Sequence, residues 1–343
     1  MKEIGSEFWT IDLDNFDNDL NFLNIGKDYK LLMSGRTAID YVLNEIDDNK
    51  KNVYMPDYCC ESMVQPFIDN NYKVEFYKVD VINNNYSIDI DYDCSVFFAM
   101  SYFGYSKSNM DNYIKEFSKR NVTIIEDITH RLLCDNNHSS YSDYLICSLR
   151  KWFPVLSGGI AINVKDSFKN NLNNYSVNNY YLDLKKRAMD LKKDYMNSNI
   201  DAKDEFLELF KESNELVSNY QNKKIDDVSL KILKRLNIEQ IRKSRINNCL
   251  LIEKLLCDNS HIHLIYKYEN GDCPLFIPVF LNNRDVIRKD LILNDVYLPV
   301  HWPNDVNSDN EIYDTELSLI CDQRYSEDDI KKYISKLIEI VGD

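Results

Sequence analysis

The sequence lacks any apolar run that approaches the roughly 18 residues of a membrane-spanning helix. Residues 1–7 also lack the apolar segment of a signal peptide, so we expect a cytoplasmic protein with no membrane partner. Positive charge is scarce as well, because 41 Lys and Arg face 56 Asp and Glu, a net charge of −15. A short basic run at 185–187 does not make the basic surface that binding to nucleic acid requires. Nucleic acid is therefore excluded as a partner.

Regular cysteine spacing is also missing. The nine Cys include the adjacent pair Cys59 and Cys60, and they do not form a disulfide framework in a chain of 343 residues. His261 and His263 alternate as in a strand, but no Cys or carboxylate spacing completes a metal site, so we expect none. The apolar content of 44% is ample for a packed core, and the length predicts about two domains.

Residues 30–165 alternate short apolar runs, rich in Val, Ile, Phe and Tyr, with segments of helical periodicity. This alternation predicts an α/β domain with a mostly parallel, buried sheet. Such sheets bind ligands beyond the carboxyl ends of their strands. The predicted strands are 53–55, 73–79, 96–100, 122–126, 144–149 and 160–164, and the predicted helices are 37–46, 61–70 and 110–120.

The rest of the chain predicts a polar helical insertion and a second domain. Residues 166–225 are rich in Asn and Lys, and 231–256 have the pattern of one long amphipathic helix between domains. Strands are expected at 263–268 and 275–280, and helices at 285–294 and 327–340. We therefore expect a large domain over 1–235, including the insertion, and a small C-terminal α/β domain over 236–343.

Three short segments could carry chemistry. The predicted strand that ends in Glu126-Asp127 has His130 three residues later. One interpretation is a strand end with an acidic cap. The other is that Asp127 pairs with a cationic group of a ligand while His130 contacts the same ligand.

The second segment contains Lys151, which lies in an apolar stretch and precedes Gly158-Gly159. Burial lowers the pKa of a lysine, and a neutral amine attacks a carbonyl to form a Schiff base. The glycine pair allows a close approach of the backbone. The alternative is a surface lysine at a strand end, followed by an ordinary turn.

The third segment, Gly35-Arg36-Thr37, opens a predicted helix. The free backbone N–H groups of a helix start favour an anion, although a plain turn capped by Thr37 is the alternative. Together the three segments fit pyridoxal 5'-phosphate (PLP), which needs a phosphate site, a carboxylate at its ring nitrogen and a lysine for the imine.

These residues resemble the DegT/StrS family of PLP-dependent sugar aminotransferases. Gly35-Arg-Thr-Ala-Ile resembles the helix-opening Ser-Gly-Thr-Ala-Ala of that family, and Glu126, Asp127 and His130 match its Glu-Asp-x-x-His/Gln pattern. Lys151 before the Gly-Gly pair reproduces the Schiff-base lysine segment. Further similarities are Met55-Pro-Asp-Tyr-Cys-Cys60, Ser101-Tyr-Phe-Gly104, Met110-Asp111 and the late segment Tyr297-Leu-Pro-Val-His301-Trp302.

The resemblance implies the PLP-dependent transferase fold of type I, with a large domain whose mixed, mostly parallel sheet is flanked by helices and a smaller C-terminal α/β domain. It implies that Lys151 forms the Schiff base, that Asp127 holds the ring nitrogen and that His130 contacts the ring or its 3-oxygen. Binding of the phosphate is implied for Gly35, Arg36, Thr37 and Ser148. The position that stacks on the cofactor falls near Cys60, with Tyr58 as a substitute, and His301 and Trp302 are implied to face the substrate.

The implied activity is transfer of an amino group from Glu or Gln to a keto group, most simply that of a nucleotide-linked sugar in polysaccharide biosynthesis. A homodimer is implied as well. One departure concerns Asp226-Asp227, which stands where the family has an Asn-x-Arg that reaches the partner's cofactor. The alternatives are PLP-dependent elimination or other amino-acid chemistry, and a catalytically silent binding or regulatory protein on the same fold.

Overall fold

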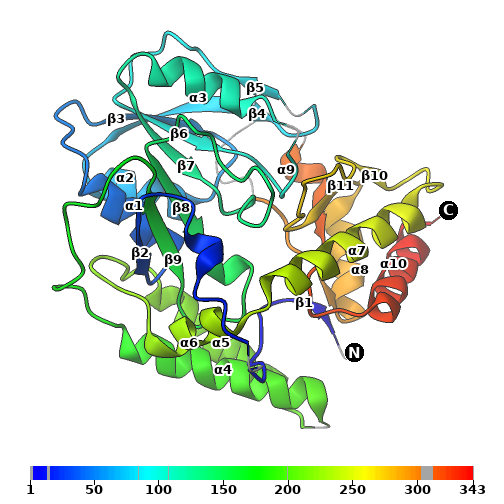
Figure 1. Ribbon diagram of the computed structural model, residues 1–343. Helices are drawn as coiled ribbons and strands as arrows, with labels where there is room; N and C mark the ends of the chain where they lie inside the picture. Colours follow the sequence, from blue (N-terminus) through cyan, green and yellow to red (C-terminus); the bar gives the residue numbers. More distant parts are fainter. Residues whose placement is uncertain are drawn as a thin grey trace.

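The computed structural model describes residues 3–13, 16–83, 85–106, 108–198, 200–302 and 312–342. Its main feature is an eight-stranded sheet in the order β2-β9-β8-β7-β6-β3-β4-β5 (Figure 1). The five strands β4, β3, β6, β7 and β8 pair in parallel, whereas β5, β9 and β2 pair antiparallel. The mostly parallel mixed sheet is therefore confirmed. The strands are β2 (Asp28–Leu32), β3 (Asn52–Pro56), β4 (Lys73–Asp80), β5 (Asn85–Ser87), β6 (Val96–Met100), β7 (Thr123–Asp127), β8 (Tyr144–Ser148) and β9 (Gly159–Asn163).

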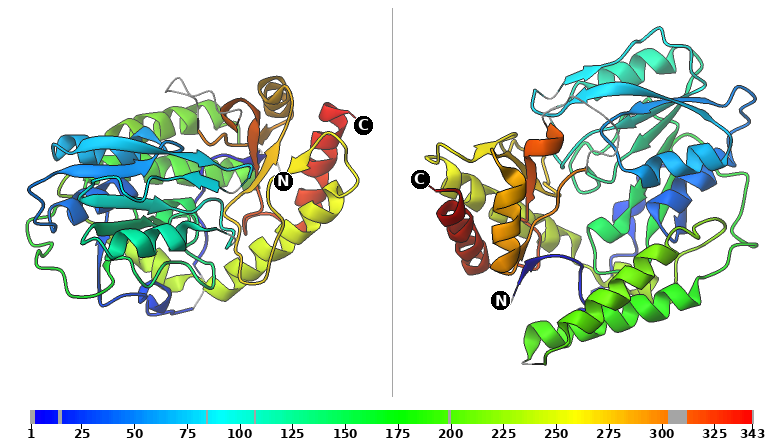
Figure 2. Two further views of the ribbon diagram at one scale, coloured as in Figure 1. Left: turned by 90° about the horizontal axis from the view of Figure 1, so that it is seen from above. Right: turned by 180° about the vertical axis from the view of Figure 1, so that it is seen from behind.

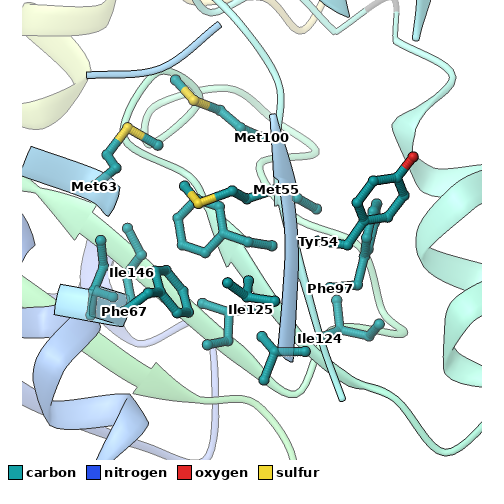
Figure 3. Close-up of a cluster of buried hydrophobic side chains, with 14 of the residues drawn as sticks. Tyr54, Met55, Met63, Phe67, Phe97, Met100, Ile124, Ile125 and Ile146 are labelled. Carbon is teal, nitrogen blue, oxygen red and sulfur yellow. The ribbon is translucent and has the colours of Figure 1, made fainter. Parts of the chain in front are cut away.

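Helices cover both faces of this sheet. Consecutive residues of a strand point to opposite faces. In β6, Phe97 stacks on Phe117 of α3 (Met110–Ser118) with ring centroids 4.2 Å apart, while Phe98 packs edge-on against Phe67 of α2 (Glu61–Asp69). All five residues of β6 are buried, as a strand covered on both faces requires. Figure 3 shows the apolar side chains that fill the space around this strand, among them Ile124 and Ile125 of β7.

A second, smaller core lies in the C-terminal part of the chain (Figure 2). It surrounds a three-stranded antiparallel sheet in the order β10-β11-β13. The elements around it are α7 (Ile238–Leu256), β10 (His263–Leu264), β11 (Ile277–Phe280), α8 (Arg284–Leu293), β12 (Val296–Tyr297), β13 (Glu316–Leu319) and α10 (Glu327–Val341). The short helix α9 (Ile312–Thr315) precedes β13, and its buried residues Ile312 and Tyr313 pack in the larger core.

Two details differ from the sequence prediction. The single helix expected over 231–256 is two helices, α6 (Asp227–Arg235) and α7, and Asn237 caps α7 by accepting from the backbone N–H of Gln240. The N-terminus, which we assigned to the large domain, forms β1 (Ile4–Gly5) and pairs in parallel with β12. Ile4 accordingly belongs to the smaller core. The position of this N-terminal segment is set by pairing with a distant strand, and such pairing leaves no local signal in the sequence.

The insertion forms two long helices, α4 (Asn179–Asn197) and α5 (Lys203–Leu216), which pack on each other along one edge of the large domain (Figure 1). Lys192 of α4 forms an ion pair of 2.8 Å with Glu3, and both side chains are buried. Because the N-terminal segment also forms β1, this pair ties the insertion to the smaller domain. Among the described helices, none is long and apolar enough to cross a membrane.

Asp226 fixes the start of α6 beside the Gly158–Gly159 turn. Its buried carboxylate accepts hydrogen bonds from the hydroxyls of Ser157 (2.5 Å) and Ser229 (2.6 Å) and from the Ser229 backbone N–H (2.8 Å). Loss of one buried partner leaves several donors unsatisfied. We therefore expect Asp226→Ala to lower the free energy of unfolding by about 2–4 kcal/mol in urea denaturation. Asp227→Ala, at the exposed neighbouring position, should change it little, and equal effects of both variants would contradict this assignment.

Candidate active site

A cavity of about 250 Å³ lies at the carboxyl ends of β7 and β8. The start of α1 (Gly35–Leu43), the start of α2 and the end of α5 close its other sides. Most of the residues predicted for the site line this one cavity, namely Gly35, Arg36, Cys60, Asp127, His130, Ser148, Lys151 and Trp302. Thr37, Tyr58 and His301 are not among the lining residues.

The start of α1 approaches the end of β8 closely. A Cβ on Gly35 would lie 3.2 Å from the Cβ of Ser148, and a Cβ on Gly159 would lie 2.0 Å from the carbonyl oxygen of Ser34. The glycine pair thus allows a close approach of the backbone, as expected, but the partner is the turn before α1. Ser34 caps the helix by accepting from the Thr37 backbone N–H at 3.2 Å.

Thr37 faces away from the cavity. It is fully buried, and its hydroxyl contacts that of Ser34 (3.0 Å) and donates to the carbonyl of Tyr220 (3.1 Å). Since its backbone N–H is also taken, the geometry does not favour Thr37 as a phosphate ligand. The backbone N–H groups of Gly35 and Arg36 remain at the helix start.

Asp127 ends β7 with a carboxylate that is almost fully buried and accepts from the Thr129 backbone N–H at 2.7 Å. Burial raises the pKa of Asp127 to about 6, while the nearby charge of Lys151 acts in the opposite direction. A buried carboxylate of this kind is stabilised by a cationic partner. The strand that was predicted to end in an acidic residue therefore does place that residue, Asp127, at the edge of a cavity.

His130 is fixed in one neutral form. Its Nδ1 accepts from the backbone N–H of Phe103 at 2.9 Å, so the ring proton is on Nε2. Burial, together with the charge of Lys151, lowers the pKa of His130 to about 3. The His130 ring stacks on Trp302 with centroids 6.0 Å apart and 21° between the planes. Among the described residues that line the cavity, His130 and Trp302 are the only two with aromatic rings.

Lys151 follows β8 in a short 3-10 helix, Leu149–Lys151, and its side chain is exposed at the cavity. Of the two interpretations left open for Lys151, a buried amine and a surface lysine at a strand end, the structure shows the exposed one, because Leu149, Trp152 and Phe153 turn into the core while Lys151 turns out. Within the described part of the chain, no ion pair holds its ammonium group. The amine therefore remains available to a ligand.

Two arginines add positive charge to the cavity. The Nε atoms of Arg36 and Arg150 are buried, and neither has a hydrogen-bond partner among the described residues. The Arg36 guanidinium lies over the ring of Tyr220, 5.6 Å from its centroid. With Lys151, three cations and one carboxylate line the cavity of a chain that is otherwise strongly acidic. Such an excess of local positive charge favours an anionic ligand.

The two candidates for the stacking position differ in placement. Cys60 lies at the cavity, with its sulfur 2.9 Å from the Ser62 hydroxyl. Tyr58 is buried behind the cavity, where its ring packs edge-on against Trp302 at 4.9 Å and its hydroxyl donates to the carbonyl of His301. The geometry therefore does not favour Tyr58 as a residue that contacts a ligand in this cavity.

Several lining residues escaped the sequence analysis. Arg150 could have been found from the sequence, because its positive charge lies directly beside the predicted nucleophile Lys151. Asn214 and Val217, at the end of α5, had no such signal, because a polar helical insertion gives no indication of which residues reach a distant cavity. The apolar walls come from residues that sequence periodicity assigns to core, and they are Ile39, Met63, Met100 and Ile146.

Comparison with known proteins establishes the fold. No model of a known family and no curated protein matches the sequence. Solved structures do match it along almost its whole length, and among them are aminotransferases of the PLP-dependent transferase fold of type I. The chain therefore has this fold, and the fold predicted from the resemblance is confirmed.

Three of these structures illustrate the similarity. PseC of Helicobacter pylori, an aminotransferase involved in pseudoaminic acid biosynthesis, is 12% identical, with 99% of both chains covered and a TM-score of 0.68. DesI, solved in the presence of its TDP-sugar product, is 11% identical, with 98% and 94% covered and a TM-score of 0.67. NtdA of Bacillus subtilis, solved with pyridoxamine phosphate (PMP), is 14% identical, with 98% of this chain and 78% of NtdA covered and a TM-score of 0.65.

Proposed function

We propose that the protein is a PLP-dependent aminotransferase that moves an amino group from glutamate or glutamine to the keto group of a nucleotide-linked sugar. The observation that carries this proposal is that Lys151 and Asp127 line one cavity together with Arg36 and Arg150. An amine, a carboxylate and an anion site are the three groups that PLP needs. The structural neighbours support the sugar substrate, since they include PseC and the TDP-sugar enzyme DesI.

The cavity fits the cofactor. An apolar cavity of about 150 Å³ is enough for benzene, so about 250 Å³ accommodates a substituted pyridine. Burial disfavours the ionised form of Asp127 and raises its pKa to about 6, and a protonated ring nitrogen is a cationic partner that stabilises this form. The unpartnered Nε of Arg36 lies at the helix start, where a phosphate finds backbone N–H groups as well.

Each residue then has a defined task. Lys151 would hold the cofactor through its amine and would carry protons during the reaction. Asp127 keeps the proton on the ring nitrogen, and His130 presents its Nε2–H to the ring or its oxygen. Gly35, Arg36 and Ser148 hold the phosphate. When bound, the cofactor acts as an electron sink for the substrate carbon.

The same proposal covers the residues that would contact the substrate. Trp302 lines the cavity and faces the substrate, with His301 behind it. Asn214 and Val217 bring the insertion to the cavity, so the insertion contributes to recognition of the sugar. We further propose that the protein works in the cytoplasm as a homodimer.

A half-reaction separates this function from its alternatives. Protein loaded with PLP is mixed with glutamate or glutamine, and its absorbance is followed. Conversion of the cofactor to its amine form, reversed by a keto sugar nucleotide, supports aminotransfer. Release of ammonia and a keto acid from serine, which unlike glutamate carries a leaving group on its β-carbon, would indicate elimination instead. Failure of every amino donor to convert the cofactor would favour a silent binding protein.

Arg36 gives a specific prediction for the phosphate site. A charge-assisted contact to phosphate contributes about 1.5–3 kcal/mol. We expect Arg36→Ala to weaken the binding of PLP by roughly 10- to 100-fold and to leave the binding of pyridoxal, which lacks the phosphate, nearly unchanged. Fluorescence titration of the cofactor-free protein with both ligands measures this difference. Arg187→Ala, at an exposed site on α4, is the control, and an equal loss for both ligands in Arg36→Ala would contradict the assignment.

A further inference from the structure

Behind the cavity, three buried polar side chains form a hydrogen-bonded chain that the proposed function does not use. Glu316 and Ser318 lie on β13, and neither is exposed to solvent. The Ser318 hydroxyl donates to Oε1 of Glu316 at 2.5 Å and lies 2.8 Å from Nδ1 of His301. Oε2 of Glu316 also accepts the backbone N–H of His301 at 2.7 Å. The carboxyl group of Glu316 is thus joined to the His301 ring through one hydroxyl.

A hydroxyl has a single proton, and this fixes the direction of the chain. When Glu316 is ionised, it only accepts, so the Ser318 proton points to it and Ser318 accepts from Nδ1–H of His301. When Glu316 is protonated, it donates to Ser318, whose own proton then points to Nδ1. In that case the proton of a neutral His301 is on Nε2.

The surroundings allow both forms of Glu316 but only the neutral form of His301. Burial raises the pKa of Glu316 to about 8, against the opposing effects of Ser318, the His301 backbone N–H and the charge of Arg284. Arg284 itself donates to the backbone carbonyl of Glu316 at 2.6 Å. Burial, with the positive charge of Lys151 nearby, holds the pKa of His301 well below its usual value. Tyr58, whose hydroxyl donates to the His301 carbonyl, stays protonated because burial and the charge of Glu316 raise its pKa.

We propose that Glu316 and Ser318 are positioning residues that set which ring nitrogen of His301 carries its proton, and that the three side chains together form a proton relay to the wall of the cavity. The His301 ring packs edge-on against His130 (5.7 Å) and Trp302 (5.2 Å), which line the cavity. Since Nδ1 is engaged by Ser318, Nε2 is the ring nitrogen at which the proton is exchanged.

The proton balance of one step is complete. In the protonated form, Nε2–H releases its proton to solvent while the Ser318 proton moves to Nδ1 and the Glu316 proton moves to the Ser318 oxygen. Because the three transfers are concerted, the ring stays neutral throughout and the negative charge ends on Glu316. The reverse sequence takes up one proton at Nε2. At no point does the buried ring become an imidazolium, which its surroundings disfavour.

Nitrogen NMR of the histidine rings tests this relay in the full-length protein without any added ligand, so its outcome is independent of the proposed aminotransfer. The chain has five His, and His301→Gln assigns the signal. We expect the protonated nitrogen of His301 to change from Nε2 to Nδ1 as the pH rises from 6 to 9.5, with a midpoint near 8. His130 is an internal control, since the Phe103 backbone N–H keeps its proton on Nε2 over this pH range.

Two variants complete the test. Glu316→Gln keeps the shape but cannot ionise, and Ser318→Ala breaks the connection, so in each the change between the two forms of His301 should disappear. The proposal is overturned if wild-type His301 keeps one form over the whole pH range. It is equally overturned if the change persists with the same midpoint in either variant. The wild-type measurement decides alone if a variant fails to fold.

Discussion

Lys151→Ala should lose the covalently held cofactor altogether, and with it the visible absorbance of the PLP-loaded protein and more than roughly 10⁴-fold of any aminotransfer activity. The reason is that Lys151 is the one described lysine that lines the cavity, so no other described amine is placed to bond the aldehyde. Absorbance spectra after incubation with PLP and gel filtration, together with a half-reaction assay with glutamate, measure both effects.

The fold should be unaffected by this change. The Lys151 side chain is exposed and forms no ion pair within the described part of the chain, so the melting temperature of the cofactor-free protein should stay within a degree or two of the wild type. Lys119→Ala, at an exposed site next to the C-terminal end of α3, is the matched control and should retain the absorbance. A Lys151→Ala protein that still shows the bound-imine spectrum would mean that another residue is the nucleophile.

The sequence predicts the centre of the large domain well because buried parallel strands are continuous apolar runs. Residues 96–100 were predicted as a strand, and β6 is Val96–Met100. The ends of β7 and β8 follow from the same signal, so Asp127 and Lys151 could be placed at a ligand-binding edge before any contact was known.

Other features depend on contacts that no local pattern contains. The sequence left open whether Lys151 is buried or exposed, because apolar neighbours on a tight turn can face inward while the lysine faces outward. The strand β1 exists only through its pairing with β12, nearly 300 residues away in the sequence. The relay was missed for the same reason, because Glu316 and Ser318 meet His301 only after the smaller sheet has formed.

Asp127→Asn should separate function from stability. The amide cannot hold a proton on the ring nitrogen of the cofactor, so we expect aminotransfer to fall by roughly 10²–10⁴-fold. The same change removes an ionised group from a buried position and keeps the acceptor for the Thr129 backbone N–H. The variant should therefore have lower aminotransfer activity with the cofactor bound. In its cofactor-free form it should have a higher free energy of unfolding than the wild type.

The pH dependence of this gain follows from the pKa of Asp127, which burial raises from 3.8 to about 6. Between these values the folded state binds more protons than the unfolded state, so the stability of the wild type falls as the pH rises through this window. Above it, the cost of the buried charge is complete and corresponds to about 3 kcal/mol. Urea denaturation at pH 8 should thus show Asp127→Asn more stable by up to about that amount, and the difference should shrink toward pH 4.

Glu126→Gln provides the matched control on the same strand. Glu126 is also buried with a raised pKa, about 7, but its side chain binds the Ser139 backbone N–H and the Ser142 hydroxyl and does not line the cavity. Successive side chains of a strand point to opposite faces, so this variant removes a comparable buried charge away from the site. It should gain stability at pH 8 as well and keep the aminotransfer activity. If Glu126→Gln lost activity as Asp127→Asn does, the carboxylate of Asp127 would have no special task at the ring nitrogen, and the assignment of the site would fail.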